Sequence, residues 1–327
     1  MNSEFDELKK ILPGLQKDVP LKEHTTFNIG GPAKYFFVAK ERESLLQAIA
    51  KAKKLKLPVF VMGGGSNLLV SDEGFSGLII KIQFASWSLQ LGKAIICEAG
   101  VMMSDLVDAS VKKGLAGLEW AGGLPGTLGG AIRGNAGAFG GEIKDSVLQV
   151  DALDSKLSYR TLSNKQCKFS YRSSIFKEKN WIVLSAKIGF KEGDKQNLGE
   201  IAKQRIEYRK EKHPLEYPNA GSVFKNVDFE KLSPKFQKLF LDKVKKDPFL
   251  IVPAAWFIIG ADLAGRKIGQ AQISQKHSNY IVNLGGARAK DVLALIVLVK
   301  KVVKEKYGIV LEQEVQYLEN RNPRIET

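Results

Sequence analysis

The chain has 327 residues, 44% apolar and 26% charged, so it is long enough for two or three domains with hydrophobic cores and is neither disordered nor low-complexity. Its net charge of +15 attracts polyanions, but that charge does not choose among nucleic acid, a sugar nucleotide, a dinucleotide and a merely solvated surface. Two cysteines (Cys97 and Cys167) and three histidines predict neither a zinc site nor a disulfide, only buried or half-buried thiols.

The N-terminal segment mixes charges with single apolar residues and lacks the apolar core of a signal peptide. The apolar run over residues 250–261 contains Pro253 and is too short to span a bilayer. We therefore expect a cytoplasmic protein that does not insert into membranes.

The first third of the chain predicts a β-α-β arrangement. Apolar positions at helical spacing indicate a helix over residues 42–57, which Pro58 ends. A short strand over residues 59–62 then leads directly into a run of three glycines, and further strands are expected over residues 68–70 and 78–80.

The rest of the chain predicts alternating strands and helices. A strand over residues 95–99 precedes a helix that Ser104 caps and Gly114 ends, followed by a long glycine-rich segment. Beyond it we expect these elements: strands over 147–153 and 181–190, helices over 199–212, 234–247 and 290–306, and a strand over 309–318. Residues 193–197 resemble a linker and place a boundary near residue 195.

Glycines concentrate in two clusters, residues 63–65 and 122–130. Glycine lets a backbone approach a ligand closely, and successive N–H groups can then surround a phosphate. Tight turns would explain one such cluster, but two clusters some sixty residues apart favour a binding role. The chain contains neither GxGxxG nor GxxxxGK[ST], which excludes the standard dinucleotide and P-loop motifs.

These clusters belong to a set of motifs that resembles one family. TFNIGGPA (26–33), GGGSNLL (63–69), GLPGTLGG (123–130) and NAGAFG (135–140) resemble the flavin-binding segments of the MurB reductases, in the family's order. The resemblance extends over residues 18–318. It implies an α+β fold, with a vanillyl-alcohol-oxidase-type FAD-binding domain of two subdomains (1–82 and 83–195) and a C-terminal α+β substrate-binding domain (196–327).

The resemblance also implies the chemistry. The family uses FAD and NADPH to reduce UDP-N-acetylglucosamine enolpyruvate to UDP-N-acetylmuramate in peptidoglycan precursor synthesis. We expect the shorter type of the family, without an extra tyrosine-bearing loop, and a monomer with no metal and no specific nucleic acid partner. The positions that match the family's FAD-binding segments are Asn28, Gly30, Gly63, Gly64, Gly65, Ser66, Asn67, Gly123, Pro125, Gly126, Thr127, Gly130, Asn135 and Gly137.

Three positions match the family's catalytic residues. Ser222, in NAGSVFKN (219–226), would donate a proton to the enolate, with Lys225 and Asn226 assisting it or binding substrate. On its own, Ser222 would be interpreted as a turn serine.

Arg172 and Glu314 complete the predicted site. Arg172 follows Tyr171, a predicted substrate residue, and its planar guanidinium would hold a carboxylate more strongly as charge develops there. Without the motif it would count as a surface arginine. Strand spacing does not separate Glu312 from Glu314, but the motif selects Glu314, with Arg172 as its partner.

Some features remain open at this stage. Gln316 stands where many family members have a basic residue, which leaves one substrate contact unassigned. His277 is expected to be a hydrogen-bonded structural histidine and Tyr280 to pack. Residues 227–252 depart from the family pattern and could form a lid, a surface helix or an interaction element.

Two other functions remain as alternatives. A different FAD-linked oxidoreductase on the same fold often attaches flavin to His or Cys, and His24 and Cys97 are the nearby candidates, but neither lies in an attachment motif. A basic nucleic-acid-binding protein would fit the net charge. It would need basic residues interleaved with exposed aromatic residues, whereas the aromatic residues here lie within apolar runs.

Overall fold

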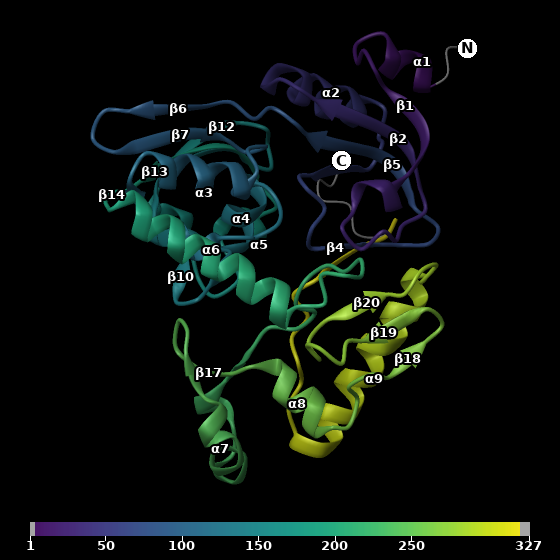
Figure 1. Ribbon diagram of the computed structural model, residues 1–327. Helices are drawn as coiled ribbons and strands as arrows, with labels where there is room; N and C mark the ends of the chain where they lie inside the picture. Colours follow the sequence, from purple (N-terminus) through teal and green to yellow (C-terminus); the bar gives the residue numbers. More distant parts are fainter. Residues whose placement is uncertain (1–3, 321–327) are drawn as a thin grey trace.

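The computed structural model describes residues 4–320. After helix α1 (Glu4–Lys9), the chain forms a mixed sheet in the upper part of the molecule (Figure 1). The strands follow the order β1 (Gln16–Pro20), β2 (Pro32–Ala39), β5 (Phe75–Ile82) and β3 (Val59–Met62). Strand β5 pairs in parallel with both β2 and β3, and helix α2 (Arg42–Lys54) connects β2 to β3. The predicted helix and the strands after it are thus confirmed, although β2, the strand before the helix, was not predicted and residues 68–70 pair outside this sheet.

A second, antiparallel sheet follows in sequence. Its order is β12 (Tyr159–Ser163), β11 (Val147–Leu153), β13 (Ile182–Gly189), β7 (Ala94–Glu98) and β6 (Trp87–Gln90). The helices of this region are α3 (Met103–Lys112), α4 (Leu128–Gly134), α5 (Ile175–Glu178) and α6 (Lys195–Lys212). One continuous apolar core joins the two sheets, and it includes Leu45 of α2 and Ile188 of β13.

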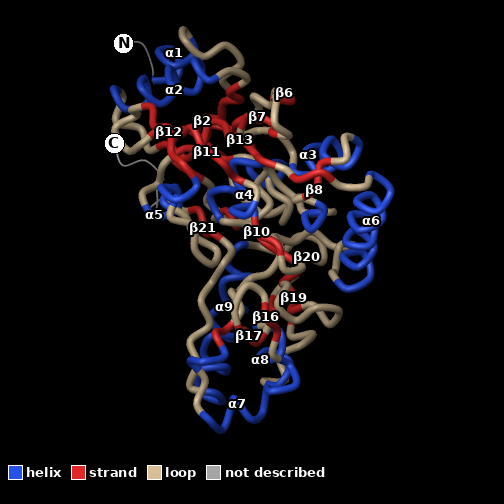
Figure 2. Tube along the Cα trace, turned by 90° about the vertical axis from the view of Figure 1, so that its left-hand side faces the viewer, coloured by secondary structure: helices blue, strands red, loops and turns tan. Residues whose placement is uncertain are grey.

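The C-terminal part forms a separate lower lobe in Figures 1 and 2. Its elements are β15 (Val227–Asp228), α7 (Pro234–Phe240), β16 (Lys245–Lys246), β17 (Leu250–Val252), α8 (Ala254–Gly260), β18 (Lys267–Ile268), β19 (Ala271–Ile273), β20 (Ile281–Asn283) and α9 (Ala289–Tyr307). The apolar face of α9, including Leu295 and Val299, contributes to a second core, which also includes Phe27, Ile29 and Leu69 of the upper part. Strand β21 (Gln316–Leu318) then returns to the upper part and pairs with β4 (Leu68–Val70), next to the first glycine loop.

Several predicted boundaries were wrong for local reasons. Helix α3 has Met102 as its N-cap, and the Ser104 hydroxyl contacts Asp105 instead of capping the helix. The helix predicted over 234–247 ends at Phe240, because Lys245 and Lys246 pair with β17. The strand predicted over 309–318 is restricted to β21.

The glycine-rich segment also contains helix α4, which the sequence did not predict because three of its seven residues are glycine. Thr127 is its N-cap and accepts a hydrogen bond from Gly130 N (3.4 Å). The glycine-rich segment therefore includes a capped helix and is not a plain loop throughout.

Helix α6 begins near residue 195, where the sequence predicted a domain boundary. It nevertheless packs against helix α3 and the second glycine cluster, which belong to the region before that boundary. Asp194 caps it by accepting a hydrogen bond from Asn197 N (2.8 Å), so the helix starts four residues earlier than predicted. Ala202 lies directly against Gly122, where a Cβ would collide with the Ala202 carbonyl oxygen. A glycine is therefore required where α6 crosses the second glycine cluster.

Helix α9 is held to the upper part by Asp72, which lies just beyond the end of strand β4. Asp72 accepts hydrogen bonds from Ala289 N (2.7 Å) and Lys290 N (3.1 Å), the first two N–H groups of the helix. Because such capping contributes about 1 kcal/mol, Asp72→Ala is expected to lower the free energy of unfolding by that amount. Denaturant unfolding measures this, with Asp72→Asn as a milder control. An unchanged denaturant midpoint for Asp72→Ala would contradict the stabilising contribution of this cap.

Both cysteines are buried and free, as predicted, and burial raises the pKa of each thiol to about 12. Within residues 4–320, the structure has no helix with the length and apolar character needed to cross a membrane.

Candidate active site

The two glycine clusters lie face to face at one side of a pocket. A Cβ on Gly63 would collide with the Thr127 hydroxyl, and one on Gly64 would lie 3.2 Å from the Gly126 Cα. Gly126 itself has φ +101°, and a Cβ there would lie 2.6 Å from the Ser66 hydroxyl oxygen. The two loops can approach this closely only without side chains, so the clusters are more than isolated turns.

Gly65 is the most constrained position of the first loop. Its φ is +66°, and a Cβ would collide with the His24 carbonyl oxygen. Gly65→Ala should therefore displace the loop and weaken binding of the FAD that the motifs predict at least about tenfold, because strain of this kind costs about 1–3 kcal/mol. Flavin fluorescence titration measures the affinity. Gly92→Ala is a matched control, since Gly92 has φ +77° but open space around it. Equal FAD affinity in the two variants would contradict the expectation.

The three predicted catalytic residues line this same pocket. Ser222, Arg172 and Glu314 come from three distant segments and meet beside the glycine loops, together with Tyr171 and Asn226. Of the predicted FAD-binding positions, the pocket lining includes Gly63, Gly64, Gly65, Ser66, Asn67, Pro125, Gly126, Thr127, Gly130 and Gly137. The structure therefore brings together most of the residues that the sequence predicted.

Arg172 and Glu314 form an ion pair in the pocket. Arg172 lies in a tight turn between Ser170 and Ser173 with φ +54°, a conformation that non-glycine residues adopt rarely. Its Nε lies 3.0 Å from Glu314 Oε1, and its Nη2 donates to the Gly137 carbonyl (2.8 Å). The guanidinium is thereby fixed from two sides.

Glu314 is held at the pocket by the return of the chain to β4. Its carbonyl accepts a hydrogen bond from Asn67 Nδ2 (3.2 Å). Burial raises the pKa of Glu314, while Arg172, Lys177 and Lys225 lower it. Glu312, the other carboxylate of the motif, instead pairs with Lys225 at the surface. The structure thus separates two residues that strand spacing alone could not.

Ser222 is positioned by a short pairing of two C-terminal segments. Val223 N donates to the Asn279 carbonyl (2.8 Å), and Phe224 N donates to Asn279 Oδ1 (3.0 Å). This pairing fixes Ser222 at the pocket wall beside Tyr280, and both residues belong to the lining.

The pocket also contains cationic side chains that the sequence reasoning missed: Arg133, Lys177 and Arg209. Arg209 Nε donates to the Gly122 carbonyl (2.9 Å), whereas its buried Nη2 finds no hydrogen-bond partner among residues 4–320. Burial lowers the pKa of Arg133 to about 10. Nothing in the sequence distinguishes these three from the other basic residues, because their position depends on tertiary packing.

Some predicted residues lie outside this lining. Lys225 contacts Glu312, and Gly123 packs against Arg209 and Ile206. Asn135 is buried, and its side chain donates to Glu142 (3.1 Å) and to the Ser170 carbonyl (2.9 Å). Asn135 therefore supports the turn that presents Tyr171 and Arg172.

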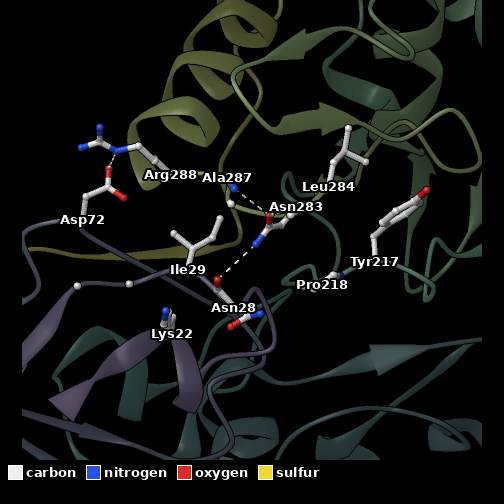
Figure 3. Close-up of a pocket in the computed structure, with 14 residues that line it drawn as sticks. Lys22, Asn28, Ile29, Asp72, Tyr217, Pro218, Asn283, Leu284, Ala287 and Arg288 are labelled. Carbon is white, nitrogen blue, oxygen red and sulfur yellow. Dashed lines mark hydrogen bonds and ion pairs between the residues drawn. The ribbon is translucent and has the colours of Figure 1, made fainter.

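Asn28 and Gly30 line a second cavity of about 580 Å³ between the upper part and the C-terminal lobe (Figure 3). There the Asn28 carbonyl accepts a hydrogen bond from Asn283 Nδ2 (3.3 Å). A direct FAD contact of these two residues stays a prediction.

The pocket lined by Ser222, Arg172 and Glu314 fits FAD by the chemistry of its residues. The loops formed by Gly63–Gly65 and Gly126 let backbone approach a ligand, as a diphosphate requires. Arg133 and Arg209 each have a buried nitrogen that lacks a hydrogen-bond partner within the described chain, which suits an anionic ligand. Residues 4–320 show no cluster of His, Cys, Asp and Glu arranged for a metal ion.

Comparisons with known proteins agree with this geometry. A family model described as an FAD binding domain matches residues 33–162, and a model of the UDP-N-acetylenolpyruvoylglucosamine reductase C-terminal domain matches residues 213–318. The fold and the pocket define an FAD-dependent oxidoreductase.

Whole-chain relatives specify the family. The chain is 41% identical over 313 residues to the UDP-N-acetylenolpyruvoylglucosamine reductase of Caldanaerobacter subterraneus subsp. tengcongensis, covering 95% of this chain and 96% of the relative. It is 38% identical over 316 residues to the Alkaliphilus oremlandii reductase, with the same two coverages. The chain belongs to the UDP-N-acetylenolpyruvoylglucosamine reductase (MurB) family.

A solved structure supports the same assignment. MurB from Thermus caldophilus superposes with a TM-score of 0.72 at 30% identity, covering 93% of this chain and all of that chain. The predicted α+β fold with a vanillyl-alcohol-oxidase-type FAD-binding domain is therefore confirmed, as is the family resemblance of the motifs.

Proposed function

We propose that the protein reduces UDP-N-acetylglucosamine enolpyruvate to UDP-N-acetylmuramate with NADPH, in peptidoglycan precursor synthesis. The observation that carries this proposal is the meeting of Ser222, Arg172 and Glu314 beside the paired glycine loops. The pocket offers a proton donor, a carboxylate-binding cation and a flavin-binding loop pair together, which is what reduction of an enol ether carrying a carboxylate requires.

FAD, when bound, supplies the transfer of a hydride equivalent from NADPH to the β-carbon of the enolpyruvyl group. Arg172 donates hydrogen bonds to the substrate carboxylate and binds it more tightly as negative charge develops there. Its ion pair with Glu314 and its bond to Gly137 hold the guanidinium in place before substrate arrives, so little reorganisation is needed.

Ser222 donates the proton that completes the reduction. Its hydroxyl breaks its O–H bond as a C–H bond forms at the substrate α-carbon. Tyr171 and Asn226 assist substrate binding, since both residues line the pocket. They hold each other in place, because Asn226 N donates to the Tyr171 hydroxyl oxygen (3.2 Å). Lys225 contributes positive charge from just outside the lining, where it lowers the pKa of Glu314.

The remaining assignments are part of the same proposal. The FAD-binding domain comprises residues 1–82 and 83–195, and residues 196–327 cover the substrate, with α6 packing back across that boundary. The protein belongs to the shorter type of the family and acts in the cytoplasm. It acts as a monomer.

NADPH oxidation tests the proposal. The purified, FAD-loaded protein should consume NADPH only when UDP-N-acetylglucosamine enolpyruvate is present, and mass spectrometry should find a product two hydrogens heavier. UDP-N-acetylglucosamine is the matched control, because it lacks the enolpyruvyl group. Equal NADPH consumption with both sugar nucleotides would contradict the proposed substrate.

A further inference from the structure

Ser222 has a neighbour that the proposed reaction has not used. The hydrogen bond from Val223 N to the Asn279 carbonyl aligns the segment after Ser222 with the segment before Tyr280. The two side chains therefore lie next to each other at the pocket wall, and Ser222 is among the neighbours that lower the pKa of the Tyr280 phenol. Tyr280 is buried, with 7% of its surface exposed.

The Tyr280 phenol also contacts a histidine on its other side. Its oxygen lies 3.1 Å from His213 Nδ1, and the two rings lie 5.1 Å apart at an angle of 37°. His213 stands at the C-terminal end of α6 and is only partly buried. Three groups with exchangeable protons thus lie in order: Ser222 and Tyr280 side by side in the pocket lining, and His213, which is nearer the surface, in contact with Tyr280.

The surroundings keep this series neutral. Burial, helped by His277, Arg209 and Lys276, lowers the pKa of His213 to about 4, so its imidazole is uncharged near pH 7. Burial likewise raises the pKa of Tyr280 to about 12, which keeps the phenol protonated. A neutral imidazole can accept a proton at one nitrogen while releasing another, as a relay requires.

The other aromatic neighbours do not continue the series. His277 meets the His213 ring edge to face, and its Nδ1 accepts a hydrogen bond from Asn279 N (3.3 Å). The Tyr208 ring lies 6.2 Å from His213, also edge to face. Among the described residues, the 3.1 Å contact of its hydroxyl with His213 Nδ1 therefore singles out Tyr280 as the residue that joins His213 to the serine.

We propose that Tyr280 and His213 form a proton relay that resupplies Ser222 during the reaction. When the Ser222 proton passes to the substrate α-carbon, the Tyr280 O–H proton moves to Ser222 Oγ. The His213 Nδ1–H proton moves to the Tyr280 oxygen, and solvent supplies to His213 Nε2 the one proton that the overall reduction consumes. The Ser222 and Tyr280 oxygens are protonated again, and His213 stays neutral in its other tautomer. Tyr280 and His213 are thus positioning residues, and the inference rests on the proposed function.

Tyr280→Phe removes only the hydroxyl group and tests the relay. In single-turnover experiments, the substrate-dependent half-reaction should slow by about tenfold or more, a part of the 10²–10⁴ that acid–base catalysis supplies. The solvent deuterium isotope effect on this half-reaction should differ between Tyr280→Phe and the wild-type protein. FAD reduction by NADPH should keep its rate, because that step precedes protonation and also reports that the variant is folded.

Tyr208→Phe is the matched control, since it removes a phenol beside His213 that does not contact Ser222. His213→Gln should reproduce the Tyr280→Phe defect, and the double variant should be no slower than either single one. In a Ser222→Ala background, Tyr280→Phe should cause no further loss, because the relay acts only through the serine.

The outcomes separate the relay from the function. If Tyr280→Phe matches Tyr208→Phe, or slows both half-reactions equally, or adds its full effect to Ser222→Ala, the relay is wrong while the function stands. If the wild-type protein is reduced by NADPH but not reoxidised by the sugar nucleotide, the proposed function fails and the relay fails with it.

Discussion

Ser222→Ala is expected to slow the substrate-dependent half-reaction by about 10²–10⁴-fold, the range that a positioned acid contributes. Reduction of the bound flavin by NADPH should remain at the wild-type rate, because that step needs no proton from Ser222. Rapid-mixing absorbance at the flavin band measures the two half-reactions separately.

The control for this variant is Ser88→Ala, which removes the same hydroxyl from an exposed position on β6. It should leave both half-reactions unchanged. A Ser222→Ala protein that reoxidises as fast as Ser88→Ala would show that the proton comes from another group, and the role given to Ser222 would be wrong.

Arg172→Lys is expected to lower kcat by about 10²-fold with FAD still bound, similar to the loss of one donor at a developing negative charge. Lysine keeps the charge but not the planar fork that contacts both Glu314 and the Gly137 carbonyl. It would also have to adopt the left-handed φ of +54° that Arg172 adopts. Steady-state kinetics over a range of substrate concentrations measure the effect.

Arg160→Lys provides a matched comparison, because Arg160 also pairs with a carboxylate, Asp154, but far from the pocket on β12. That change should leave kcat unaltered. A kcat loss of less than twofold in Arg172→Lys would mean that positive charge alone suffices at this position and that the fork geometry is not used.

The sequence predicted which segments meet at the pocket better than it predicted the bounds of the helices and strands around it. Ser222, Arg172 and the glycine loops stand in short continuous motifs, so local sequence was sufficient to expect them at one pocket, while their roles stay predictions. Glu314 needed the motif as well, because Glu312 has the same strand spacing and only the tertiary structure gives the two carboxylates different partners.

The features that the sequence did not predict depend on contacts between segments far apart in the chain. Arg209 reaches the pocket because α6 crosses the second glycine cluster, and Tyr280 reaches Ser222 through the pairing of Val223 with Asn279. We expected Tyr280 only to pack, since a buried tyrosine shows no sign in sequence of where its hydroxyl points. The strand pairing of Lys245 and Lys246 likewise overrides the helical spacing that predicted a longer α7.

The most direct test of the proposed reaction is the visible spectrum of the FAD-loaded protein under anaerobic conditions. NADPH should bleach the flavin band, and stoichiometric UDP-N-acetylglucosamine enolpyruvate should restore it. A band that NADPH bleaches and that this sugar nucleotide leaves bleached would contradict the proposed substrate, and a protein that takes up no FAD would contradict the assignment of the pocket.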